Sequence, residues 1–182
     1  MNFLEKFREI DTFVLDVDGV LTNGELLIME DGSLLRKMNV RDGYAIKRAI
    51  EEGYEVAVIS GGHSEGVIKR LGKLGITTIY TNVKDKKSCY LSFTELNNLD
   101  HAGILYMGDD LPDYEVMRLV GLPCCPRDAA VEILELSQYI SPVAGGKGCV
   151  RDVIEKVLRL HGRWHIHAQL QSIDPLINDS ES

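Results

Sequence analysis

Short runs of consecutive apolar residues constrain what this chain can fold into. The clearest runs lie at 13–15, 56–59 and 104–107. Continuous apolarity, without an alternating polar face, is typical of strands buried on both sides of a parallel sheet. Amphipathic helical stripes separate the runs, for example at 45–50 and 67–74. The pattern predicts a doubly wound α/β fold with a mainly parallel sheet.

Residues 20–40 interrupt this alternation. Two strand-like runs, 25–29 and 34–40, flank a turn that contains Asp31-Gly32, which is a β-hairpin signature. A hairpin in this position is either an edge decoration or an oligomerisation surface. The 182 residues fit one domain. We assign 1–164 to that domain, with the hairpin as an insertion at about 20–40, and 165–182 to a partly mobile C-terminal tail.

Charge and cysteine content exclude several classes of partner. Twenty Lys and Arg against 28 Asp and Glu give a net charge of −8, with no basic run. We therefore expect no binding to nucleic acid or to an anionic membrane. No apolar stretch approaches the roughly 18–20 residues of a membrane span. The four cysteines contain no CxxC pair, so we expect reduced thiols and a cytoplasmic protein.

Polar residues follow each of the three apolar runs. Asp16-Val17-Asp18-Gly19 follows the first, Ser60-Gly61-Gly62 the second and Gly108-Asp109-Asp110 the third, while Lys86 directly precedes a helical pattern. Ligands bind at the carboxyl ends of strands in open parallel sheets, so these groups should share one site. The first acidic pair alone could equally form an Asx-turn with Gly19. The ordered set of acids, hydroxyl and lysine is far more specific than any one member.

This order of motifs resembles the haloacid dehalogenase (HAD) superfamily of phosphotransferases. Further segments resemble one family within it, the 3-deoxy-D-manno-octulosonate (KDO) 8-phosphate phosphatases. These segments are 39–43 (Asn-Val-Arg-Asp-Gly), 60–62 and 145–148 (Gly-Gly-Lys-Gly). The resemblance extends over roughly 13–164.

The resemblance implies roles for the clustered residues. Asp16 would be the nucleophile that forms an aspartyl phosphate, and Asp18 the general acid and base. Mg²⁺ would bind the side chains of Asp16 and Asp109 and the backbone carbonyl of Asp18. Ser60 and Lys86 would hold the phosphoryl oxygens, with Lys84 and Lys87 as rivals for the lysine. Asp110 and Asp113 would hydrogen-bond to the groups that bind the metal, without binding it themselves, or would cap a helix.

A second group of residues matches substrate contacts of the family. The group comprises Asn39, Val40, Arg41, Asp42, Gly43, Lys47, Gly61, Gly62, His63 and Arg70. For 39–47 the alternative is a strand end leading into a helix that is capped by Asp42, with Lys47 on its exposed side. Arg70 could bind a sugar-acid carboxylate or simply belong to a charged helix face. Many relatives carry arginine where this chain has Gly62, and a nonulosonate 9-phosphate branch carries glutamate there.

The resemblance also implies how the site is enclosed. Only the hairpin occupies the first insertion point, and the segment from Lys86 to Gly108 is too short for a second cap domain. We therefore expect a member without a cap domain, whose site is enclosed by neighbouring subunits of a homotetramer, as in the family.

The implied activity is Mg²⁺-dependent hydrolysis of KDO 8-phosphate, a small-molecule sugar-acid phosphate, in lipopolysaccharide precursor synthesis. One alternative is a phosphatase for a related ester such as 2-keto-3-deoxynononate 9-phosphate. Another is a structural subunit without catalysis, although no motif residue is missing. A signalling receiver domain fails on motif order, because receivers place the phosphoacceptor aspartate on a middle strand.

Overall fold

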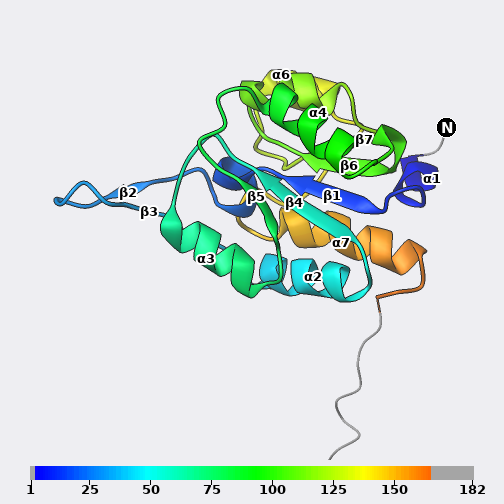
Figure 1. The fold of residues 1–182 in the computed structure, drawn as a ribbon, viewed down its shortest axis with the longest axis horizontal. Helices are drawn as coiled ribbons and strands as arrows, with labels where there is room; N and C mark the ends of the chain where they lie inside the picture. Colours follow the sequence, from blue (N-terminus) through cyan, green and yellow to red (C-terminus); the bar gives the residue numbers. More distant parts are fainter. Residues whose placement is uncertain (1–2, 165–182) are drawn as a thin grey trace, which may run out of the picture.

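A six-stranded parallel sheet forms the centre of the protein in the computed structural model, which describes residues 3–164 (Figure 1). The strand order is β5-β4-β1-β6-β7-β8. The strands are β1 (Thr12–Leu15), β4 (Glu55–Ile59), β5 (Thr78–Tyr80), β6 (Ile104–Met107), β7 (Leu122–Cys125) and β8 (Tyr139–Ile140). The predicted doubly wound α/β fold is confirmed. The predicted tail, 165–182, lies outside the described residues.

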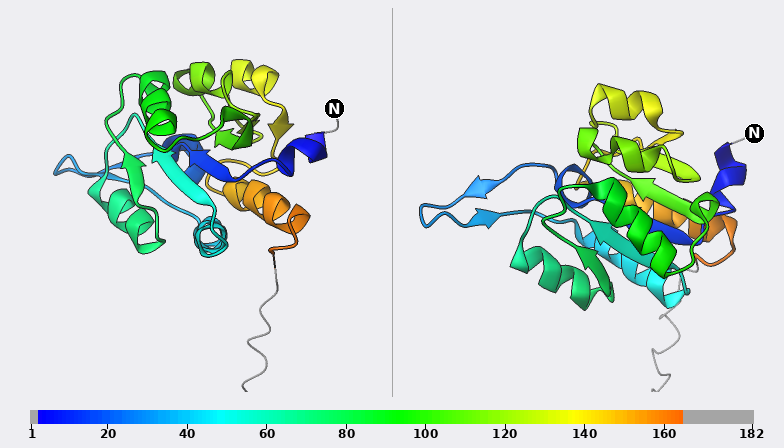
Figure 2. Two further views of the ribbon diagram at one scale, coloured as in Figure 1. Left: turned by 45° about the vertical axis from the view of Figure 1, so that its right-hand side comes forward. Right: turned by 45° about the horizontal axis from the view of Figure 1, so that its top comes forward.

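Helices cover both faces of the sheet (Figure 2). One face carries α1 (Phe3–Phe7), α2 (Val40–Glu51), α3 (Glu65–Lys73) and α7 (Cys149–Leu160), and the other carries α4 (Lys86–Leu96), α5 (Tyr114–Met117) and α6 (Val131–Leu136). Phe13 and Leu15 of β1 enter the first core, whereas Val14 enters the second. The strand has no polar face because both of its faces are buried.

The hairpin projects from the body between β1 and α2 (Figures 1 and 2). Its antiparallel strands are β2 (Leu27–Ile28) and β3 (Leu34–Leu35), and a single bridge between Thr22 and Met38 closes its base. Within residues 3–164 no other domain is inserted into the sheet core.

The predicted strand over 34–40 is too long, and the predicted helix cap was assigned to the wrong residue. Val40 already begins α2, and the Asn39 side chain accepts the Arg41 N–H at 2.8 Å. Asparagine is as good an N-cap as aspartate. Asn39 therefore caps α2, and Asp42 lies inside the helix.

Asp42 joins α2 to α7. Its Oδ1 accepts the backbone N–H of Arg151, in the first turn of α7, at 2.7 Å. Its Oδ2 is buried and has no hydrogen-bond partner among residues 3–164. Burial raises the pKa of Asp42 to about 6, against the opposing effect of the Arg151 N–H.

Two glycines let the loop before α7 approach the turn that follows β1. A Cβ on Gly145 would lie 1.9 Å from the carbonyl oxygen of Gly19, and one on Gly146 would lie 2.5 Å from the amide nitrogen of Asn23. The Gly146 N–H donates to the Val20 carbonyl at 2.9 Å. This close backbone packing fixes the turn that carries Asp18.

All four cysteines are free, as expected for reduced thiols. In the part of the chain that the structure describes, we find no helix with the length and apolarity needed to cross a membrane.

The Asp42 carboxylate should make stability depend on pH. The folded-state pKa of Asp42 lies above the ordinary value. The stabilisation that the protonated carboxyl provides is therefore fully present below about pH 4 and is lost as the pH rises through about 6. Asp42→Asn lacks this titration. The free energy of unfolding of the variant minus that of the wild type should therefore rise between pH 4 and pH 7, by on the order of 1–3 kcal/mol. Urea unfolding across this range measures it, with the exposed Asp100→Asn as control. A difference that stays constant with pH would contradict the assignment.

Candidate active site

Three neighbouring strands bring the predicted groups to one edge of the sheet. In β4-β1-β6, Leu15 pairs with Val58 and with Met107, so the three strands end at the same level. A cleft opens at this edge. Its lining comprises Asp16, Asp18, Gly24, Ser60, Gly61, Gly62, Lys86, Asp109, Asp110, Pro112 and Asp113. The ordered set of motifs thus forms one site.

Glycines make room for the acidic side chains. Gly19 has a φ of +93°, and a Cβ on it would lie 1.9 Å from Oδ2 of Asp109. A Cβ on Gly108 would lie 2.5 Å from that of Asp113. Glycine is needed at both positions because a carboxylate already occupies the space next to its Cα.

The acids form a tight cluster. Carboxylate oxygens of Asp16, Asp109 and Asp113 lie within 4.8 Å of one another. Burial, and then the repulsion between these groups, raise the pKa of both Asp16 and Asp109. Oδ1 of Asp109 is buried without a hydrogen-bond partner among residues 3–164. An oxygen-only donor set with excess negative charge fits a hard divalent cation such as Mg²⁺.

Asp113 differs from the other two acids because its oxygens already accept hydrogen bonds. Oδ1 accepts from Nζ of Lys86 at 2.7 Å and from the Tyr106 hydroxyl at 2.6 Å. Oδ2 accepts the N–H groups of Asp109 and Asp110 at 3.1 and 3.4 Å. Asp16 and Asp109 therefore remain the carboxylates best able to bind a metal, and Asp113 supports them. Asp110 caps the short turn Leu111–Asp113.

Lys86 is the cation inside the cluster. It is the first residue of α4, and its buried Nζ lies 2.8 Å from Oδ1 of Asp16. Burial alone would lower the pKa of Lys86, but Asp16 and Asp113 raise it above its ordinary value. Of the two rivals, Lys84 is exposed and Lys87 pairs with Glu115. The geometry favours Lys86.

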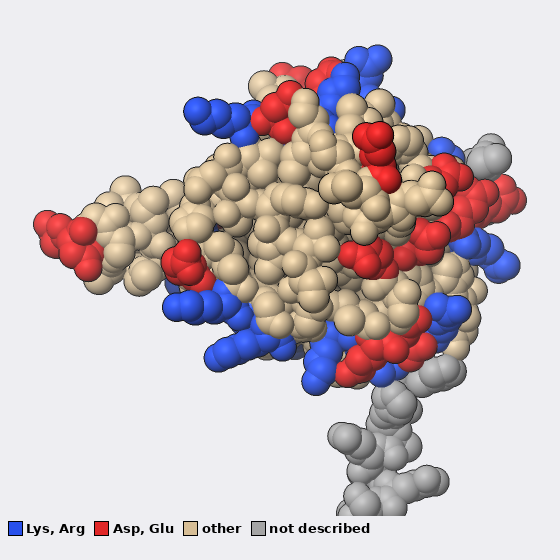
Figure 3. Space-filling view, viewed as in Figure 1, with Lys and Arg blue, Asp and Glu red and all other residues tan. Residues whose placement is uncertain are grey.

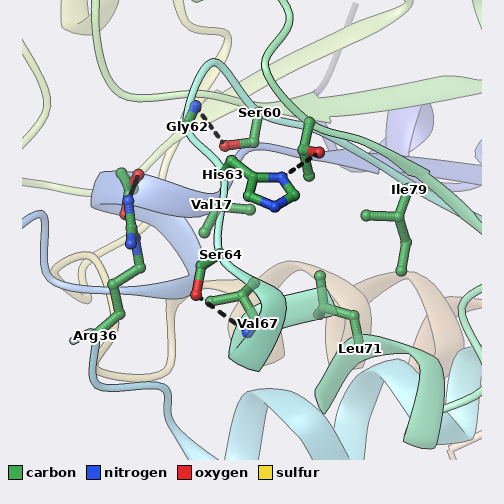
Figure 4. A pocket seen from close by; sticks show the side chains of 11 residues that line it. Val17, Arg36, Ser60, Gly62, His63, Ser64, Val67, Leu71 and Ile79 are labelled. Carbon is green, nitrogen blue, oxygen red and sulfur yellow. Dashed lines mark hydrogen bonds and ion pairs between the residues drawn. The ribbon is translucent and has the colours of Figure 1, made fainter. Parts of the chain in front are cut away.

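The segment after β4 forms another wall of the cleft. Ser60 is buried, and its Oγ accepts the Gly62 N–H at 3.2 Å. His63 contacts Thr81 through Nδ1 at 3.0 Å and Glu65 through Nε2 at 3.2 Å. Figure 4 shows Ser60, Gly62 and His63 around the small pocket beside the cleft.

Asp18 has a partner that the sequence did not indicate. Nε and Nη2 of Arg36 donate to its two oxygens at 2.7 and 3.2 Å. Arg36 follows β3 of the hairpin, 18 positions along the chain. The only sign of this contact in the sequence is a positively charged residue on the returning strand of the hairpin.

Comparison with known proteins identifies the family. No protein-family model matches the chain. KDO 8-phosphate phosphatase KdsC of Escherichia coli K12 is 36% identical over 160 residues, which cover 88% of this chain and 85% of that protein. The chain belongs to the KDO 8-phosphate phosphatase family. A putative HAD superfamily hydrolase of Legionella pneumophila also matches the fold, with a TM-score of 0.85 at 34% identity over 88% of each chain.

Two solved structures of KDO 8-phosphate phosphatases match this fold closely. The Yersinia pestis enzyme has a TM-score of 0.86 at 32% identity, covering 88% of this chain and 86% of its own. The Moraxella catarrhalis enzyme, a complex with magnesium ion, phosphate ion and KDO, has a TM-score of 0.84 at 30% identity, covering 88% and 92%.

Most of the residues that were predicted to contact the substrate do not line the cleft of a single chain. Asn39, Val40, Arg41, Asp42, Gly43 and Lys47 belong to α2 or its cap. Lys47 is exposed, and its Nζ lies 3.9 Å from Oε1 of Glu51. Arg70 lies against α2, since a Cβ on Gly43 would be 2.8 Å from Nη2 of Arg70. Gly61 and Gly62 do line the cleft, and His63 lies beside it. The substrate contacts on α2 and at Arg70 stay predictions.

Tyr106 is the other residue that sequence reasoning missed, because it lies within an apolar run. Its fully buried hydroxyl donates to Asp113, and burial, then the nearby acids, raise the Tyr106 pKa well above its ordinary value. The hydroxyl therefore stays protonated and holds Asp113 toward Lys86.

Tyr106→Phe should lower kcat about tenfold, because a lost hydrogen bond behind a metal site typically costs 10- to 100-fold. The free energy of unfolding should fall by about 1 kcal/mol. Tyr90→Phe is the matched control, because its buried hydroxyl bonds to His101 Nδ1 at 2.7 Å outside the site. Steady-state kinetics and urea unfolding of both variants measure the effects. Equal kcat values for the two variants would contradict a role for Tyr106.

Proposed function

We propose that this chain is a Mg²⁺-dependent phosphomonoesterase that hydrolyses KDO 8-phosphate to KDO and phosphate, in lipopolysaccharide precursor synthesis. The observation that carries the proposal is the buried Asp16, held by Lys86 beside the acidic cluster at the carboxyl end of β1. The KdsC relative and the complex of the Moraxella catarrhalis enzyme with KDO support the choice of substrate.

Asp16 begins the reaction. One of its oxygens bonds to phosphorus as the bond from phosphorus to the C8 oxygen of the sugar breaks, which yields an aspartyl phosphate. Asp18 enters this step protonated on one oxygen, while its other oxygen still accepts from Arg36, and it gives this proton to the leaving alkoxide. Asp18 then takes a proton from a water molecule as that water attacks phosphorus, which frees phosphate and restores Asp16.

Positive charge and hydrogen-bond donors must offset the negative charge that gathers at Asp16. Asp16, Asp109 and the backbone carbonyl of Asp18 would hold Mg²⁺, which would neutralise charge on the carboxylates and the phosphoryl group. Lys86 holds Asp16 and offers its remaining donor capacity to a phosphoryl oxygen. The Ser60 hydroxyl, whose oxygen accepts the Gly62 N–H, supplies a neutral donor on the other side.

Phosphate release from a panel of sugar-acid and ordinary sugar phosphates tests the function. KDO 8-phosphate should be hydrolysed fastest, EDTA should abolish release, and added Mg²⁺ should restore it. Asp16→Asn should lose on the order of 10³-fold or more of kcat and stay folded, because it removes a buried charge without changing side-chain size. Asp100→Asn, at an exposed cap, is the control.

Each other outcome has a distinct meaning. Faster hydrolysis of 2-keto-3-deoxynononate 9-phosphate would support the proposed reaction and overturn the proposed substrate. No metal-dependent release from any ester would overturn the enzyme proposal in favour of a structural subunit.

The proposal includes a homotetramer in the cytoplasm. The hairpin exposes apolar side chains on both strands, with Leu27 61% and Ile28 71% exposed. On the face shown in Figure 3, the projecting part of the hairpin is uncharged apart from its acidic tip. An apolar projection of this kind is typical of a surface that another subunit covers. Free cysteines fit a reducing compartment.

Leu27→Glu and Ile28→Glu should dissociate the tetramer, because each places a charge in the proposed interface. Analytical ultracentrifugation measures the mass of each variant. Leu96→Glu is the matched control, since Leu96 is 80% exposed at the end of α4, away from the hairpin. A wild-type protein that sediments as a monomer would contradict the proposal.

A further inference from the structure

The base of the hairpin reaches the active site through one side chain, Arg36. The bridge between Thr22 and Met38 holds the two legs of the hairpin together where they leave the body. Arg36 lies two positions before Met38, between β3 and this bridge. The Arg36 side chain is only 6% exposed, although the rest of the hairpin is largely open to solvent.

Arg36 holds both oxygens of the Asp18 carboxylate. Nε donates to Oδ1 at 2.7 Å and Nη2 to Oδ2 at 3.2 Å. A planar fork of this kind fixes the plane of a carboxylate as well as its position. The other contact that the structure gives to the carboxylate is a long one, from the Thr22 hydroxyl to Oδ1 at 3.5 Å. The orientation of Asp18 in the cleft therefore depends mainly on Arg36.

The remaining donor group of Arg36 is unused. Nη1 is buried and has no hydrogen-bond partner among residues 3–164. Burying an unpaired donor is costly, so an arginine that served stability alone would be expected to use it. Among the described residues, Asp18 is the only ion-pair partner of Arg36.

Gly62 leaves the space that this pair needs. A Cβ at position 62 would lie 2.9 Å from Oδ2 of Asp18 and 3.2 Å from Nη2 of Arg36. A side chain at this position would require Oδ2 of Asp18 to shift and Nη2 of Arg36 to move by a few tenths of an ångström. Figure 4 shows Arg36 and Gly62 lining the same pocket, with Arg36 coming from the hairpin and Gly62 from the segment after β4.

We propose that Arg36 is a positioning residue for phosphate ester hydrolysis: it orients the Asp18 carboxylate toward the leaving oxygen and the attacking water. This inference rests on the proposed function of Asp18 as proton donor and acceptor. Arg36 acts through Asp18, so it should affect the proton-transfer steps and leave substrate binding and attack by Asp16 largely unchanged.

Two substrates separate these steps. The alkoxide of KDO needs a proton to leave, whereas p-nitrophenolate leaves without one. In Arg36→Met, kcat for KDO 8-phosphate should fall about 10- to 100-fold while KM changes by less than about threefold. The rapid burst of p-nitrophenol from p-nitrophenyl phosphate should keep its rate, because Asp16 still attacks. Arg36→Lys should recover part of the loss, and Lys37→Met, at the exposed neighbouring position, is the matched control.

A double-mutant cycle tests the role of Gly62. Gly62→Ala should lower kcat in the same way, since its methyl group displaces the ion pair. In the double variant Arg36→Met/Gly62→Ala, the two losses should not multiply, because both substitutions disrupt the same pair. Thermal unfolding of each variant monitors folding.

The outcomes are distinguishable. If the wild type hydrolyses no phosphate ester, the proposed function itself fails. If the wild type is active, the inference is overturned by wild-type kcat in Arg36→Met, by a p-nitrophenol burst that slows as much as kcat for the sugar ester, or by fully multiplicative losses in the double variant.

Discussion

Mutual repulsion between Asp16, Asp109 and Asp113 is the constraint on which the site depends. Their oxygens lie within 4.8 Å of one another, with one buried cation, Lys86, among them. Burial and repulsion hold the pKa of Asp16 and Asp109 above their ordinary values. A raised pKa favours the protonated carboxyl, which is not a nucleophile, and further positive charge favours the ionised carboxylate. The folded chain thus stores the cost of crowding its acids, and a divalent cation relieves it.

The rest of the fold makes this crowding possible. Three parallel strands end at one level and deliver the acids and the hydroxyl to one edge. Glycines at 19 and 108 remove the side chains that would keep the carboxylates apart, and Gly145 packs against the backbone of Gly19 to hold the first turn in place. The site is therefore shaped as much by the atoms that glycine lacks as by the groups that carry out the chemistry.

The sequence was most informative where burial or motif order determines the outcome. The apolar runs predicted β1, β4 and β6, and the order of polar residues predicted the groups at the strand ends, because parallel strands must end together. Side-chain direction is a different matter. Whether Tyr106 or Arg36 turns toward the acids depends on strand orientation and on the path of the hairpin, which no local pattern encodes. Likewise, Asn39 and Asp42 are both good caps, and only the packing of α2 against α7 decides between them.

The attachment of the hairpin by Arg36 has a consequence for protein engineering. A compact variant of this enzyme would most simply be designed by cutting the hairpin away where it leaves the body. That cut removes Arg36 together with the apolar strands, and it leaves the Asp18 carboxylate without its guanidinium. A different shortening replaces only the segment from Leu27 to Leu35. It keeps the bridge between Thr22 and Met38, and it keeps Arg36. The hairpin is thus divisible into a replaceable outer segment and a base that belongs to the active site.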